Sequence, residues 1–170
     1  RILSESGRHD AASAEIEIAL ALDPESFEVH RAAAYLRFRQ KRTKDAILHF
    51  EKAQSLMETD VSSGNMLMTC HTALGDSAAA QRQAHITVER AQKALAQDPS
   101  NGAAMGFSCC ALALLGQAES AKGWMSRALL IDPDNTNMRY NFACTLATFL
   151  KDVDGAIELL DPLFERISIG

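Results

Sequence analysis

Apolar residues recur along this chain with the spacing of helix faces rather than of strands. The first clear stripe falls on a helix expected over about residues 8–22 and consists of Ala12, Ile16, Ala19 and Leu20. Further helices are predicted over about residues 27–40, 44–57, 61–74, 77–97, 102–115, 117–131 and 136–149, with a last one from about residue 152. Because Ala, Leu and Met favour helices and β-branched residues are sparse, no strand is predicted.

Local signals mark where these helices begin and end. Side chains that can cap a helix N-terminus stand at the expected starts: Ser26, Thr43, Asp60, Asn101 and Asn135. The segment 77–97 contains neither Pro nor Gly, so it is expected to form one long helix. The last helix either continues past Pro162 with a kink or ends there.

The helices are organised by a repeat. Two Asp-Pro pairs place Pro99 and Pro133 34 residues apart, and a turn containing Gly116 separates the two apolar segments between them. Small residues recur 17, 12 and 5 positions before each of two prolines: Gly116, Ala121 and Ala128 before Pro133, and Gly7, Ala12 and Ala19 before Pro24. A fixed period in this range indicates stacked helical repeats.

This pattern resembles the tetratricopeptide repeat (TPR), in which the Gly forms the turn between two helices and the small Ala residues allow close helix packing. The resemblance implies an all-α, TPR-like α-solenoid, a right-handed superhelix of antiparallel helix pairs. We expect one TPR-like domain over residues 1–170, with repeats of about 1–24, 25–58, 59–99, 100–133 and 134–170. The chain begins without Met inside a repeat, so a fragment of a longer protein is expected.

Three repeats depart from the pattern. In the second, Lys41 stands at the Gly position and Glu58 at the Pro position. In the third, Pro99 follows Gly75 by 24 residues, seven more than in the regular repeats, which is close to two helical turns. In the fifth, one extra residue falls near Phe149–Leu150.

Composition and charge limit the classes of function that this chain can have. With 17 basic and 22 acidic residues, the net charge of −5 argues against a nucleic-acid binder. No apolar run approaches the roughly 18 residues needed for membrane insertion, and no signal peptide is visible. The four cysteines form no CxxC motif and are expected to be buried, reduced thiols of a cytoplasmic protein: Cys70, Cys109, Cys110 and Cys144.

No arrangement of residues predicts catalysis, a metal site or a cofactor. The five histidines lack the spacing of a helical metal site: His9, His30, His49, His71 and His85. Ser108 is not in a GxSxG elbow, and no strand precedes Gly102 and Gly106, as a phosphate-binding loop would require. The chain itself is therefore not expected to be an enzyme.

A basic cluster consists of Arg37, Arg39, Lys41, Arg42 and Lys44. These cations form either a solvated helix end, where they complement the helix dipole, or a docking patch for an acidic peptide or an anionic headgroup. The sequence leaves both interpretations open.

The TPR resemblance implies that the first helix of each repeat lines a concave groove that takes a peptide. The peptide-groove candidates are Arg31, Tyr35, Phe38, Asn65, Met66, Thr69, Phe107, Tyr140 and Asn141, with Cys110 and Cys144 beside them. Amide side chains can hold a peptide backbone, and aromatic side chains can supply apolar anchors. The alternative for Phe38, Met66 and Phe107 is a place in the core between helices. The Lys/Asn pattern of carboxylate-clamp chaperone adaptors is not reproduced.

A narrower resemblance lies in the runs Arg127–Asn135, Met138–Cys144 and Leu159–Phe164, which look like the C-terminal TPR region of bacterial class III adenylate cyclases. It implies an upstream domain that makes cyclic AMP, whose metal-binding carboxylates are absent here. The predicted function is a regulatory scaffold that binds a protein or peptide partner. The alternative is a self-association module, a homodimer that aligns an attached catalytic domain. Residues 77–97 are expected to overhang their repeat and to contact a second copy, an upstream domain or the following repeat. The alternative is that this helix simply packs on the helix of residues 102–115.

Overall fold

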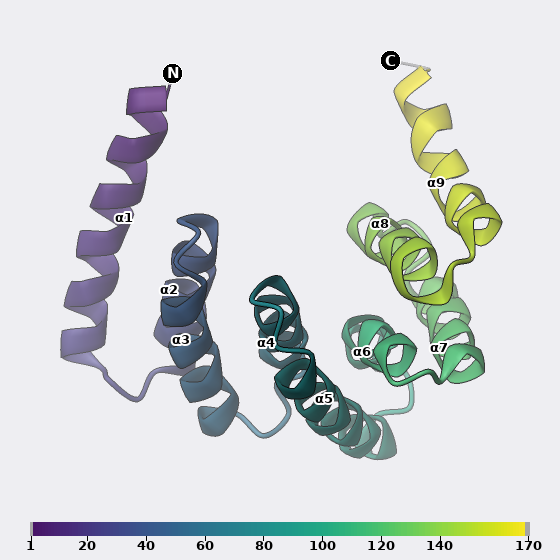
Figure 1. Ribbon diagram of the computed structural model, residues 1–170, viewed down its shortest axis with the longest axis horizontal. Helices are drawn as coiled ribbons and strands as arrows, with labels where there is room; N and C mark the ends of the chain where they lie inside the picture. Colours follow the sequence, from purple (N-terminus) through teal and green to yellow (C-terminus); the bar gives the residue numbers. More distant parts are fainter. Residues whose placement is uncertain (1, 169–170) are drawn as a thin grey trace. The chain divides into compact units, whose positions relative to one another are not determined.

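The computed structural model describes the backbone of residues 2–168 and the side-chain burial of residues 11–162 and 164. In this part of the chain every regular element is a helix, as Figure 1 shows. The α-helices are α1 (Ile2–Leu22), α2 (Phe27–Arg39), α3 (Thr43–Leu56), α4 (Ser62–Ala73), α5 (Ser77–Gln97), α6 (Gly102–Leu114), α7 (Ala118–Ile131), α8 (Thr136–Thr145) and α9 (Val153–Ser168). A π-helical segment, η1 (Leu146–Leu150), follows α8 directly. The all-α prediction is confirmed.

The chain divides into two compact units, residues 1–83 and 84–170, and the boundary falls within α5. In the first unit, neighbouring helices along the chain pack on one another: α1 on α2, α2 on α3, and α3 on α4. Their core contains Ala34, Ala46, Phe50, Leu67 and Cys70, all buried. Two of these five are alanines, so side chains of small volume bring the helix backbones close together.

In the second unit, α6 packs against α7 and α8, and α8 packs against α9. The large buried side chains include Met105, Leu112 and Phe142. Ala121 and Ala128 of α7 are fully buried, which confirms the expectation that these two alanines lie at close helix contacts.

Most of the predicted caps form. The side-chain oxygens of Ser26, Asn101 and Asn135 each accept a hydrogen bond from the backbone N–H three residues later. Asp60 Oδ1 accepts from the backbone N–H groups of Ser62 and Ser63 at the start of α4. The prediction for Thr43 is wrong: Thr43 is the first residue of α3, and its N-cap, Arg42, makes no side-chain capping bond.

A left-handed residue follows α2, α4, α6 and η1, where the chain turns from the first to the second helix of a pair. These residues are Lys41 (φ 61°), Gly75 (φ 75°), Gly116 (φ 74°) and Lys151 (φ 57°). Gly75 and Gly116 adopt this conformation without steric cost, whereas the two lysines hold it despite their Cβ atoms. The same left-handed turn therefore recurs along the chain, even at the two positions where lysine stands in place of glycine.

The irregular repeats are accommodated inside helices. The extra residue predicted near Phe149–Leu150 coincides with η1, because a π-helical turn accommodates one residue more than an α-helical turn. α9 continues through Pro162 to Ser168, which decides between the two alternatives for that helix. Gly7 does not form a turn: α1 begins at Ile2 and runs through it, since one glycine costs a helix only about 1 kcal/mol.

Candidate functional site

The nine predicted groove residues lie on first helices of the repeats, α2 and α4 in the first unit and α6 and α8 in the second. All nine keep some solvent exposure. The exposed ones are Arg31, Thr69, Phe107, Tyr140 and Asn141, and the half-buried ones are Tyr35, Phe38, Asn65 and Met66. Each unit therefore presents its own candidate surface.

On the first unit, the aromatic candidates are partly core residues. The Tyr35 ring meets the buried Phe50 ring edge-on, with centroids 5.2 Å apart and an interplanar angle of 88°. Phe38 and Met66 also pack against the buried cluster of this unit. Phe38 and Met66 are therefore partly core residues, and their half-buried side chains keep a solvent-facing part, so their place in a peptide groove stays a prediction.

Polar groups surround this aromatic surface. The Arg31 guanidinium carbon lies 5.3 Å from the centre of the Phe27 ring, within the range of a cation–π contact. Burial raises the pKa of Tyr35, the Arg31 charge opposes this effect, and the buried Asp60 adds to it. The Asn65 side-chain oxygen is buried and accepts no hydrogen bond from the described residues. This surface is therefore mixed in polarity.

On the second unit, a pocket of about 430 Å³ lies between α6 and α8. It brings together two of the predicted residues, Phe107 and Asn141. The remaining lining residues are Gly102, Ala103, Gly106, Ile131, Asp132, Asn135, Asn137, Met138 and Phe142. Tyr140 does not line the pocket; it is exposed, and a hydrogen bond with Cys144 raises its pKa.

Two glycines shape this pocket. A Cβ atom at Gly106 would lie 3.3 Å from Met138 Sδ, and one at Gly102 would lie 3.4 Å from Ile131 Cγ2. Gly102 and Gly106 are four residues apart and so share one face of α6. Larger residues at these positions would fill the space that separates α6 from Ile131 and α8.

Four of the lining residues were not predicted as site residues from the sequence: Ile131, Asp132, Asn137 and Met138. The signal that could have found one of them is the spacing of Asn137 and Asn141, which places two amides one turn apart on the first helix of a repeat. Asp132 could not be found in this way, because it lies in the turn after α7.

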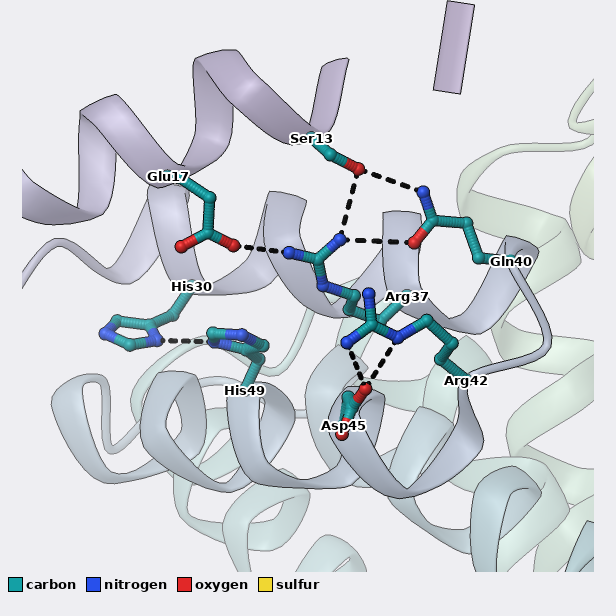
Figure 2. A network of polar contacts seen from close by, with 8 residues as sticks. All are labelled: Ser13, Glu17, His30, Arg37, Gln40, Arg42, Asp45 and His49. Carbon is teal, nitrogen blue, oxygen red and sulfur yellow. Dashed lines mark hydrogen bonds and ion pairs between the residues drawn. The ribbon is translucent and has the colours of Figure 1, made fainter. Parts of the chain in front are cut away.

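The basic cluster is smaller than predicted. Arg37 is buried, and its guanidinium donates hydrogen bonds to Ser13, Gln40 and Glu17, as Figure 2 shows. Arg42 is paired with Asp45 through two nitrogens. The other four cations of the cluster are exposed: Arg39, Lys41, Arg42 and Lys44. Arg37 is thus a packing residue between α1 and α2, where its charge is neutralised by Glu17.

The thiols differ in accessibility. Burial raises the pKa of Cys70 to about 11, of Cys109 to about 12 and of Cys110 to about 11, which keeps these sulfurs protonated and unreactive at neutral pH. The expectation that all four cysteines are buried is wrong for Cys144, which is exposed on α8. Among the described residues, no group of three or more His, Cys, Asp and Glu side chains could hold a metal ion. None of the described helices is long and apolar enough to cross a membrane.

Comparison with known proteins identifies the fold. Residues 1–58 match the family described as "Tetratricopeptide repeat". No curated protein matches the chain by sequence.

Solved structures extend the likeness to almost the whole chain. TTC0263 of Thermus thermophilus, described as a thermophilic TPR protein, is similar with a TM-score of 0.69 at 19% identity, over 96% of this chain and 85% of that chain. YrrB, described as "a TPR protein with an unusual peptide-binding site", gives 0.53 at 23% identity, over 94% of this chain and 78% of that chain. MamA of Desulfovibrio magneticus is similar with a TM-score of 0.58 at 14% identity, over 95% of this chain and 86% of that chain. The chain therefore has the α-solenoid fold of TPR proteins.

Proposed function

We propose that this chain is a protein-interaction scaffold that binds a peptide or a partner domain on the first helices of its repeats. The observation that carries this proposal is the pocket between α6 and α8, which joins an exposed aromatic ring, Phe107, to an exposed amide, Asn141. A concave, mostly apolar site with a few polar groups is the usual form of a ligand site. The description of YrrB as having a peptide-binding site supports the same class of ligand.

The nine groove candidates are proposed as the contact residues of this scaffold. Their chemistry fits a peptide, because aromatic rings bury apolar area at low entropic cost and amides both donate and accept hydrogen bonds. The TPR pattern further proposes five repeats that form one domain of a cytoplasmic protein. The resemblance to cyclase TPR regions adds the proposal that this domain regulates an adenylate cyclase, with the catalytic domain upstream as a partner.

The scaffold proposal is tested by selecting a displayed random-peptide library on the purified chain and then measuring binding of the enriched peptides by fluorescence anisotropy. The affinity of the enriched peptides should fall by about tenfold or more in Phe107→Ala or Tyr35→Ala, since each substitution removes an aromatic anchor. A selection that enriches no peptide above the bare support would contradict the scaffold proposal.

A second candidate function is self-association, favoured by an exposed apolar face on α9. Val153, Ile157 and Phe164 are each more than half exposed, and their spacing places them on one side of the helix. Sedimentation velocity of the wild type and of Ile157→Glu distinguishes this candidate. A dimer that Ile157→Glu converts to monomer supports it, whereas a monomeric wild type eliminates it.

A further inference from the structure

The pocket between α6 and α8 combines an apolar interior with a polar edge. The apolar part is formed by Phe107, Ile131, Met138 and Phe142. Two of these side chains, Phe107 and Ile131, are exposed to solvent. The space left by Gly106 lies directly beside Met138, a side chain that adapts readily to the shape of its neighbour. An aliphatic or Met side chain entering the pocket would remove this apolar area from water.

The polar edge carries two amides with a regular spacing. Asn137 and Asn141 both line the pocket and both are exposed. Four residues of α-helix rise about 6 Å, which is close to the roughly 6.6 Å that two residues of an extended chain span. Each amide can therefore meet one peptide group of an extended backbone, at residues whose side chains point to the same side.

The charge at the pocket has one sign. Asp132 is the only charged residue among the described lining residues, and it is exposed. Its Oδ2 accepts a hydrogen bond from Asn135 Nδ2 at 2.8 Å, which holds the carboxylate in the turn before α8. A cationic side chain is therefore favoured beside the pocket, and an acidic one is repelled.

We infer that the pocket between α6 and α8 recognises an extended peptide in which an aliphatic or Met side chain enters the pocket and an adjacent Lys or Arg meets Asp132. This inference rests on the proposed function and gives the scaffold a specific class of partner, a basic and apolar segment. The peptide backbone is held by Asn137 and Asn141.

The test uses the full chain and a displayed random heptapeptide library, followed by anisotropy measurements with the enriched peptides. Two variants probe the pocket. Ala103→Leu places a larger side chain into it from an exposed helical position, and Asp132→Asn removes the charge at constant size. The matched control is Ala78→Leu, which makes the same change from Ala to Leu at an exposed position of α5 that does not line the pocket.

The enriched peptides should share an aliphatic or Met residue next to Lys or Arg. Replacing that apolar residue with Ala, or using Ala103→Leu, should weaken binding about tenfold or more. Asp132→Asn should lower the preference for Lys over Ser by about two- to fivefold and leave the apolar preference intact. Ala78→Leu should bind like the wild type, and circular dichroism should show that all three variants are folded.

Peptides that bind Ala103→Leu as tightly as the wild type but lose affinity with Tyr35→Ala would overturn this inference and leave the scaffold proposal standing. Enrichment of acidic peptides, or of peptides insensitive to Asp132→Asn, would overturn the assignment of a basic partner. If a second copy of the chain occupies the pocket, Ala103→Leu will instead change the sedimentation coefficient, which also overturns the inference. A selection that enriches nothing contradicts the proposed function itself.

Discussion

His30 Nδ1 and His49 Nδ1 lie 3.1 Å apart and join α2 to α3, as Figure 2 shows. His30 Nε2 lies 3.0 Å from the carbonyl oxygen of Pro24, which can only accept a hydrogen bond. His30 Nε2 therefore carries a proton. When both rings are neutral, His30 Nδ1 is the acceptor and His49 Nδ1 is the donor.

This pair makes the stability of the first unit depend on pH. The pKa of His49 is lowered from its ordinary value of 6.5 by burial first, and then by the charges of His30 and Arg37, while Glu17 and Asp45 oppose the shift. Because the unfolded chain then binds more protons than the folded one, this contribution is present above about pH 6.5 and is lost as the pH falls. Thermal unfolding followed by circular dichroism should show a lower midpoint at about pH 5.5 than at about pH 7.5.

The pH dependence should become smaller in His49→Asn, which removes the titrating ring. His85→Asn is the matched control, since His85 is exposed on α5. An unchanged pH dependence in His49→Asn would show that another group causes it.

The planar fork of Arg37 determines the contact between α1 and α2. Arg37→Lys keeps the charge but replaces two separate donor nitrogens, one facing Ser13 and Gln40 and the other facing Glu17, with a single nitrogen. The free energy of unfolding in urea should fall by about 1–3 kcal/mol. Arg39→Lys makes the same change at an exposed position two residues away and should stay within about 0.5 kcal/mol of the wild type. Equal effects of the two substitutions would rule out a structural role for Arg37.

Ala121 is fully buried in α7, so a larger side chain there must displace a neighbouring helix. Ala121→Leu should lower the free energy of unfolding by about 1–3 kcal/mol. The same substitution at the exposed Ala103 of α6 should have little effect on stability. A neutral Ala121→Leu would mean that the packing of α7 is looser than described.

Replacing two glycines inside helices with alanine distinguishes the effect of helix propensity on stability from the effect of packing. Gly123→Ala in α7 meets no atom within 4 Å and should stabilise the chain by about 0.5–1 kcal/mol, because alanine favours helix. Gly106→Ala offers the same gain, but its Cβ would lie 3.3 Å from Met138 Sδ, which must shift. Thermal melts should therefore show a smaller gain for Gly106→Ala, and equal gains would indicate open space beside Met138.

Helix positions could be predicted because the signals are local. Asn101 and Asn135 cap the helices that they precede, and Pro99 and Pro133 lie in the turns just before those caps. The extra residue near Phe149–Leu150 could also be predicted, since it changes the spacing between landmarks, although its form as a π-helical turn could not.

The sequence by itself determined the all-α class, the positions of most helices, four of the five predicted caps and the buried alanines of α7, because hydrogen bonds within a few residues and side-chain size set these features. Tertiary structure alone decided the sites. Arg37 became a packing residue because folding brings Glu17 beside it, and the pocket arose because folding places Gly106 beside Met138, 32 residues later in the chain. Such contacts depend on how helices approach one another, which helical periodicity does not encode.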